Sequence, residues 1–287
     1  MKLPNIVVRI LAGAVFVGLL LGGILINEYT FLVVFSIITV LCLYEFYGLI
    51  EKDAKVKVPK WLNIVGGLLL FGGAFWYNSA PNCLFITTLI SCLLPYGIFL
   101  LALFINELYR KRENPIQSLG YSLLGQIYIA LPFALLNNLA FPTTWWAKYE
   151  YIFVLAIFVF IWVNDSFAYL TGMAFGKHRL FERISPKKSW EGFIGGAAVS
   201  IASSLIFAHF YPNLSIPAWM GFAAVTVAFG TWGDLFESLI KRTLGVKDSG
   251  NMIPGHGGIL DRFDSTILAI PAVVVYLLLV SLVPSFF

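Results

Sequence analysis

The sequence predicts an all-α, polytopic integral membrane helix bundle of about nine transmembrane helices, and three observations lead to this fold class. First, 59% of the 287 residues are hydrophobic and only 12% are charged, which is about half the charged fraction of a typical soluble domain. Second, the apolar residues come in long blocks, unlike the short runs that build a soluble core. Third, the basic residues gather in every second connection between those blocks.

Each predicted span is an apolar stretch of roughly 20 residues, the length that crosses the hydrocarbon core of a bilayer. The ranges are 7–27, 30–50, 62–80, 83–104, 119–140, 151–175, 190–211, 217–237 and 266–285. Lys2 and Arg9 stand at the start of the first range, as they would in a signal peptide. No small-residue cleavage site follows, so we expect a retained first helix.

The charges of the loops predict the orientation. One set of alternate connections holds 18 of the 19 Lys and Arg residues, and the other set holds Lys148 alone. Because basic loops stay on the cytoplasmic side, the N-terminus is expected inside and the C-terminus outside. We expect a single integral membrane unit over 1–287, with scaffold spans of few polar residues in 1–150 and catalytic spans and cytoplasmic loops in 151–287.

Four polar clusters after residue 150 are the candidate functional residues, and all are predicted to reach the cytoplasmic side. The first is WVNDSFAY, where Asp165 stands inside an apolar span. A carboxylate within a span costs free energy and marks either a site or a buried ion pair that locks helices.

The second cluster is SPKKSWEG, which contains Lys187, Lys188 and Ser189. Ser189 is placed to cap a helix that begins at Trp190. Ammonium and hydroxyl groups at a helix start suit a phosphate. The alternative is a basic loop that only orients the chain.

The third cluster is GDLFESLIKR, in which Asp234, Glu237, Ser238 and Lys241 follow the spacing i, i+3, i+4, i+7. On a helix these four side chains share one face at the membrane boundary. The alternative is a solvated helix end with an internal ion pair.

The fourth cluster is PGHGGILDRFD, where a glycine turn precedes two carboxylates, Asp261 and Asp264, in the expected first turn of the last helix. Glycine turns allow close backbone approach and form anion-binding nests. Mg²⁺ binds one or two carboxylates together with substrate phosphates. The residues therefore predict a metal-dependent phosphate site at the cytoplasmic membrane surface.

The stretch from Ser238 to Asp264 resembles the signature of the phosphatidate cytidylyltransferase (CDP-diacylglycerol synthase) family. The matching residues are Ser238, Lys241, Arg242, Lys247, Asp248, Gly250, Ile253, Pro254, His256, Gly257, Gly258, Asp261, Arg262 and Asp264. The resemblance extends to GDLFES, to NDSFAY and to SPKKSWEG, where Ser189 stands at a position that is more often Thr in the family. Residues 1–150 match only in being several hydrophobic spans.

The resemblance implies that phosphatidate and CTP react, with Mg²⁺ as cofactor, to give CDP-diacylglycerol and pyrophosphate. Asp234, Asp261 and Asp264 would hold the metal, and Asp165 is a further metal ligand or a partner of a lysine. Ser238, Lys241 and Arg242 would bind phosphates, and the turn His256, Gly257, Gly258 would hold the nucleotide phosphates. Lys187 and Lys188, beside Ser189, would meet the lipid phosphate or the pyrophosphate. Lys247 and Arg262 are further substrate contacts in the motif.

Two other functions remain open at this level. A CTP-dependent kinase of a lipid alcohol such as polyprenol or phytol would share the metal and nucleotide site. A transporter also explains carboxylates within spans, although its polar residues would lie on both faces of the membrane. No zinc spacing, Walker loop or Rossmann fingerprint is present, and no nucleic-acid partner is expected. We expect the inner membrane of a bacterium, with the site facing the cytoplasm, and a homodimer is one option for the assembly.

Overall fold

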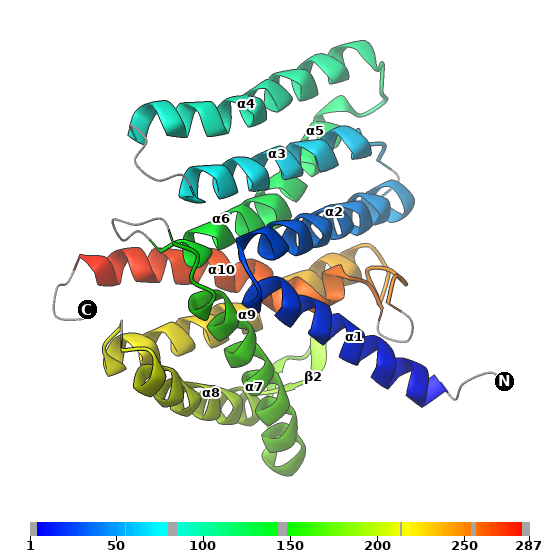
Figure 1. Ribbon diagram of the computed structural model, residues 1–287. Coiled ribbons are helices and arrows are strands. Elements are labelled where there is room, and N and C mark those ends of the chain that lie inside the picture. Colours follow the sequence, from blue (N-terminus) through cyan, green and yellow to red (C-terminus); the bar gives the residue numbers. More distant parts are fainter. Residues whose placement is uncertain are drawn as a thin grey trace. The chain divides into compact units, whose positions relative to one another are not determined.

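The computed structural model describes residues 5–54, 56–79, 85–142, 148–212, 214–253 and 257–282, and helices dominate it (Figure 1). The helices are α1 (Asn5–Leu25), α2 (Glu28–Asp53), α3 (Lys60–Ser79), α4 (Phe85–Tyr109), α5 (Pro115–Gly125), α6 (Leu131–Ala140), α7 (Ile152–Phe175), α8 (Trp190–Phe210), α9 (Ile216–Thr243) and α10 (Leu260–Ser281). A π-helical turn, η1 (Gln126–Ala130), joins α5 to α6. The chain also contains a hairpin of two strands, β1 (Arg179–Phe181) and β2 (Ser185–Ser189).

Seven helical stretches of the described chain are long and apolar enough to cross a membrane. They are Glu28–Lys52, Cys92–Tyr109, Pro115–Ala140, Ile152–Phe175, Trp190–Phe210, Ile216–Thr243 and Leu260–Ser281. Each coincides with a predicted span, which confirms an integral membrane helix bundle. The two remaining predicted spans, 7–27 and 62–80, fall on the helices α1 and α3, which are not among these seven stretches. The count of nine therefore stays a prediction.

The chain forms two compact units, and the boundary between them falls inside α10. Unit 1 comprises residues 1–151 and 244–262, and unit 2 comprises residues 152–243 and 263–287. In unit 1, α3 lies between α2 and α4 (Figure 1). Its buried residues include Gly66, Gly67, Leu70 and Phe71. The two glycines, which have no side chain, let α3 pack closely on both neighbours.

Unit 1 contains a buried polar network that joins several of its helices. Tyr47 donates from its hydroxyl to the Ser122 carbonyl at 2.7 Å, and Asn63 donates to the Ser122 hydroxyl at 2.8 Å. Gln126, in the π-helical turn, donates to the Asn63 carbonyl at 2.7 Å. Hydrogen bonds of this kind join helices within a membrane, where no water competes for them. The network therefore ties α2, α3 and the α5–α6 helix together.

Unit 2 is built on the contact between α7 and α8, the most extensive between two elements of the chain. Small residues at every fourth position of α8 (Gly192, Gly196, Ser200 and Ser204) are buried, and the Ser200 hydroxyl donates to the Phe160 carbonyl at 3.0 Å. Close helix contacts in membranes use such small residues. The helix α9 packs on both α7 and α8.

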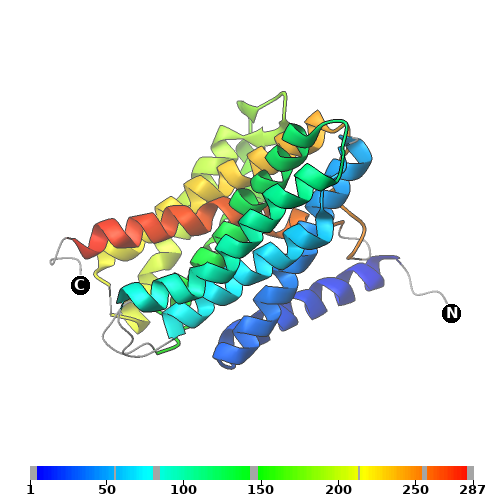
Figure 2. The ribbon, with the colours of Figure 1, turned by 90° about the horizontal axis from the view of Figure 1, so that it is seen from above.

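One short hairpin accompanies the helices of this all-α bundle. The strands β1 and β2 pair antiparallel, with Arg179 opposite Ser189 and Phe181 opposite Ser185. The hairpin connects the end of α7 to the start of α8 and extends from that end of the two helices (Figure 2). A short polar run without alternating apolar and polar residues does not predict a strand. Only the structure shows that Lys187 and Lys188 belong to the strand β2.

Candidate active site

Five of the predicted site residues of unit 2 line one cavity of about 540 Å³. Its lining combines polar residues of α7, the hairpin and α9 with the apolar side chains of Met173, Leu180 and Phe193. Of the predicted site residues, it contains Asp165, Lys187, Lys188, Ser189 and Asp234. Three stretches of the sequence up to about 70 residues apart therefore contribute to one cavity that is both charged and apolar.

Asp234 is the centre of the charged contacts at this cavity. Its carboxylate forms an ion pair with the Lys188 ammonium and accepts a hydrogen bond of 3.3 Å from the Ser238 hydroxyl. One turn further along α9, Lys241 pairs with Glu237 at 2.5 Å. The predicted stripe on α9 therefore contains two side-chain contacts, Ser238 with Asp234 and Lys241 with Glu237. The helix also runs to Thr243, beyond the predicted end at residue 237.

Asp264 belongs to the same group of charges. The carboxyl groups of Asp264 and Asp165 both interact electrostatically with Lys188 and Asp234, and Asp264 also interacts with Lys241. The group contains three carboxylates and two ammonium groups from α7, the hairpin, α9 and α10. Such a charge-dense group inside a membrane protein requires mutual pairing, and it is typical of a functional site.

Gly233 permits α9 and α10 to approach at the level of Asp264. A Cβ atom at this position would lie 3.1 Å from both the Cα and the carbonyl oxygen of Ser265, and closer still to the Asp264 carbonyl. These are backbone atoms, which cannot rotate away. The glycine therefore sets the distance between the helices that carry Asp234 and Asp264.

We expect Gly233→Ala to lower thermal stability and to displace Asp264, because the new methyl group forces α9 and α10 apart. A loss of roughly 1–3 kcal/mol in unfolding free energy is the usual cost of such overpacking. The matched control is Gly72→Ala in α3, where an added Cβ meets no atom within 4 Å; alanine there should be neutral or stabilising. Thermal unfolding in detergent checks both variants, and equal midpoints would contradict the packing role of Gly233.

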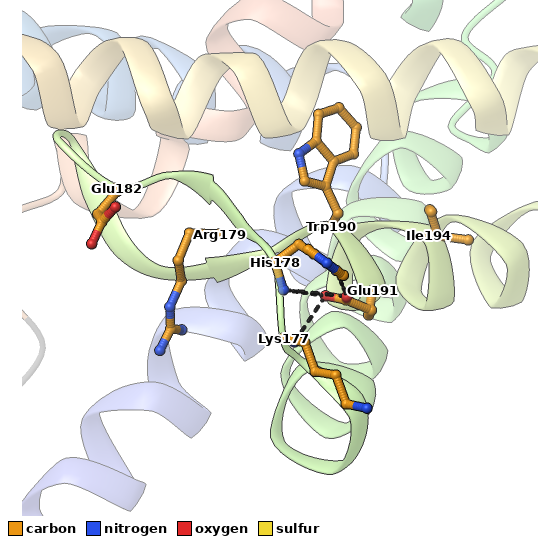
Figure 3. Close-up of a pocket in the computed structure, with 7 residues that line it drawn as sticks. All are labelled: Lys177, His178, Arg179, Glu182, Trp190, Glu191 and Ile194. Carbon is orange, nitrogen blue, oxygen red and sulfur yellow. Dashed lines mark hydrogen bonds and ion pairs between the residues drawn. The ribbon is translucent and has the colours of Figure 1, made fainter.

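The hairpin is held in place at both of its ends. The Ser189 hydroxyl accepts a hydrogen bond of 3.1 Å from the Gly192 amide and caps α8, which confirms the predicted cap. Glu191, in the first turn of α8, accepts from the amides of Lys177 (3.1 Å) and His178 (3.2 Å) and pairs with His178 Nδ1 at 2.6 Å (Figure 3). These contacts fix the strand that carries Lys187 and Lys188. Sequence reasoning did not identify Glu191, whose only signal is an acidic residue in the first turn of a helix.

Unit 1 contains the other half of the predicted site, in the loop 244–259 and the start of α10. Asp261 stands in the first turn of α10, as predicted, and its carboxylate accepts hydrogen bonds from the Gly258 amide (2.8 Å) and the Ser249 amide (3.1 Å). Gly257 has φ +83°, a conformation that favours glycine. The Ile253 amide bonds to the Gly257 carbonyl at 3.0 Å and closes the turn. His256 lies outside the described residues.

The remaining predicted residues lie at the surface. Arg242 at the end of α9, Lys247 in the loop and Arg262 in α10 are exposed. Lys187 is also exposed, whereas Lys188 and Asp234 are half-buried, with side chains 30% and 29% exposed. The structure thus brings Asp165, Lys188, Asp234, Lys241 and Asp264 together in unit 2 and places Asp261 with the glycine turn in unit 1.

The carboxylates of unit 2 fit a divalent cation that also binds phosphate. Within the described ranges, no group of three or more His, Cys, Asp or Glu side chains is placed to hold a metal ion by itself. Asp234 and Asp264 form a pair of mutually repelling carboxylates, and Mg²⁺ commonly binds one or two carboxylates and completes its shell with phosphate oxygens and water. The donor set is therefore chemically suitable for a metal that enters with a phosphate.

Comparisons with known proteins point to the same chemistry. The model of a family described as the cytidylyltransferase family matches residues 7–280. A phosphatidate cytidylyltransferase of Haemophilus influenzae is 46% identical over 123 residues, which are 41% of this chain and 43% of that protein. Proteins of the same name from Staphylococcus aureus and Staphylococcus epidermidis are 46% identical over 120 and 121 residues, in each case 42% of this chain and 46% of the relative. The similar stretch therefore spans less than half the length of these relatives.

Proposed function

This chain belongs to the cytidylyltransferase family, and from that premise we propose that it is a phosphatidate cytidylyltransferase. It would transfer CMP from CTP to phosphatidate and release CDP-diacylglycerol and pyrophosphate, a nucleotidyltransferase reaction of phospholipid biosynthesis. The names of the bacterial relatives support this substrate pair. The residues of the candidate active site support it independently.

The observation that carries the proposal is the combination of charges and apolar surface at the cavity of unit 2. Lys188 and Asp234 meet there, and the same cavity is lined by apolar side chains of α7 and α8. A phospholipid presents an anionic head group joined to acyl chains, so a site for it needs both kinds of surface. A water-soluble phosphate donor alone would not need the apolar side.

In the proposed reaction, an oxygen of the phosphatidate phosphate attacks the α-phosphorus of CTP. A new P–O bond forms, the bond between the α-phosphorus and the bridging oxygen to the β-phosphate breaks, and pyrophosphate leaves with the electron pair. Both reactants are anions, so positioning and charge neutralisation are the main tasks of the protein. Lys187, Lys188, Lys241 and Arg242 supply positive charge for the phosphates, and the Ser238 hydroxyl supplies a hydrogen-bond donor.

Asp234 and Asp264 are the proposed metal ligands in unit 2, with Asp165 as a further one. When bound there, Mg²⁺ would offset the charge of the phosphate oxygens. Asp261, in the first turn of α10, is proposed as another carboxylate ligand. Lys247, Arg262 and the turn His256, Gly257, Gly258 would contact the nucleotide phosphates.

The proposed topology follows from the loop charges and from the helices. Nine spans, with the N-terminus inside and the C-terminus outside, would put the hairpin, the end of α9 and the loop 244–259 at the cytoplasmic surface, where CTP is available. The bacterial relatives support the cytoplasmic (inner) membrane. A homodimer is one option for the assembly.

The test is an assay of the purified protein in detergent with phosphatidate, radiolabelled CTP and Mg²⁺. We expect labelled CDP-diacylglycerol and pyrophosphate, and loss of at least about 99% of the rate when EDTA removes the metal, because two unshielded anions repel each other. Activity that EDTA leaves intact would contradict the metal assignment. A polyprenol or phytol that becomes phosphorylated in place of phosphatidate would instead indicate the lipid-alcohol kinase, and substrate flux in proteoliposomes without CTP would indicate a transporter.

A further inference from the structure

Glu45, on α2, is the one carboxylate of the first two spans that the structure describes as buried, with 7% of the residue exposed. It lies in the apolar stretch Glu28–Lys52. Such a residue is normally paired or functional. Neither the sequence motifs nor the residues proposed above give it a role.

The Glu45 carboxylate accepts two hydrogen bonds from the loop that precedes α10. Its Oε2 atom accepts from the Ser249 hydroxyl at 3.1 Å and from the Leu260 amide at 2.9 Å. The Leu260 amide belongs to the first residue of α10 and has no partner within its own helix. Glu45 therefore caps the N-terminus of α10, although it lies 215 residues away in the sequence.

The glycines of the loop permit this contact. A Cβ atom at Gly250 would lie 2.8 Å from the Glu45 Cδ atom, and one at Gly258 would collide with Glu45 Oε2 and the Ser249 hydroxyl. The backbone of the loop thus packs directly against the carboxylate from two sides. Ser249 in turn donates its amide to Asp261, so Glu45, Ser249 and Asp261 form one chain of contacts.

We infer that Glu45 is a positioning residue of the active site: it holds residues 248–253 and 257–260, at the start of α10, in the conformation in which Asp261, Gly257 and Gly258 bind substrate. This inference rests on the proposed function. Glu45 touches no reacting group and acts through Ser249 and Leu260. A carboxylate suits the task because one buried oxygen accepts two donors, each of which would otherwise lack a partner.

The experiment compares four variants with the wild-type enzyme. Glu45→Leu keeps most of the bulk and removes the acceptors, whereas Glu45→Gln keeps an oxygen that accepts both bonds. Ser249→Ala removes one donor without changing α2, and Glu51→Gln changes an exposed carboxylate of the same helix as the matched control. Hydrogen–deuterium exchange of the segment 244–262 and the kcat and KM for CTP are measured for each protein in detergent.

Glu45→Leu is expected to speed the exchange of this segment by about tenfold and to lower kcat/KM for CTP by a similar factor, the scale of an unsatisfied buried donor. Ser249→Ala should show a smaller change of the same kind. Glu45→Gln should restore both quantities to within about threefold of the wild type, and Glu51→Gln should leave them unchanged.

Unchanged exchange in Glu45→Leu overturns the inference, and so does faster exchange with an unaltered kcat/KM. A loss of activity that Glu45→Gln does not rescue overturns it as well, because the acceptor would then not be what matters. A wild-type protein that makes no CDP-diacylglycerol would sink the proposed function instead. In that case, the exchange contrast between the Leu and Gln variants still decides whether Glu45 holds the loop.

Discussion

Replacement of Asp264 by Asn is expected to lower the rate of CDP-diacylglycerol formation by about 10³-fold or more, the effect of removing a group that stabilises transition-state charge. Asn has the same shape but cannot supply a negative ligand. The neighbouring charges, Asp234, Lys188 and Lys241, remain in place. Single-turnover assays with radiolabelled CTP at saturating Mg²⁺ measure the change.

The structure makes Asp264→Asn a cleaner test than Asp261→Asn. Asp261 also holds the loop through the amides of Ser249 and Gly258, so its replacement changes local structure together with charge. The Asp264 side chain accepts a hydrogen bond from the amide of Ser265, its own neighbour. Glu113→Gln, at an exposed carboxylate between α4 and α5, is the matched control. Near-wild-type turnover of Asp264→Asn would remove Asp264 from the site.

Replacement of Lys188 by Met is expected to lower kcat/KM by about 10²-fold, because the site loses a positive charge next to Asp234. The apolar stem of the side chain is retained, so packing in the cavity changes little. Lys188→Arg keeps the charge and should recover part of the activity, although a guanidinium does not place its donors as an ammonium does. Steady-state kinetics with phosphatidate and CTP varied separately show which substrate loses affinity.

Lys177→Met is the matched control for Lys188. Lys177 is an exposed lysine at the base of the same hairpin, and the hydrogen bond to Glu191 comes from its backbone amide, which the substitution leaves intact. An equal loss of activity in both variants would mean that the general positive charge of the hairpin matters, and not the contact of Lys188 with Asp234.

Much of the candidate site was predictable because its signals are local. The cap of α8 by Ser189 follows from a hydroxyl before an apolar run, and the row of charges on α9 follows from helical spacing. The position of Asp261 in the first turn of α10 follows from the glycine turn directly before it, since glycines favour a turn and the helix begins after them. Each of these inferences needs only residues within one or two helical turns of each other.

The contacts of Glu45 and Glu191 could not be predicted in the same way. No residue near Glu45 in the sequence indicates that this side chain contacts Ser249 and Leu260. The hairpin that Glu191 anchors has no alternating pattern of apolar and polar residues that would predict its strands. The sequence predicts a close backbone approach at Gly258, and the structure shows that its lack of a side chain also lets the loop pack on Glu45. Long-range contacts depend on how helices pack, and a single sequence contains no direct record of them.

The sequence by itself determined that the chain is an integral membrane protein and that its candidate functional residues gather in four clusters after residue 150, because hydropathy and local polar patterns are properties of short stretches. The tertiary structure decided which clusters meet. It brings Asp165, Lys188, Asp234 and Asp264 into one group in unit 2 and ties the glycine loop to α2 in unit 1. The physical reason is that buried charges are stable only beside partners, and those partners come from helices distant in the sequence.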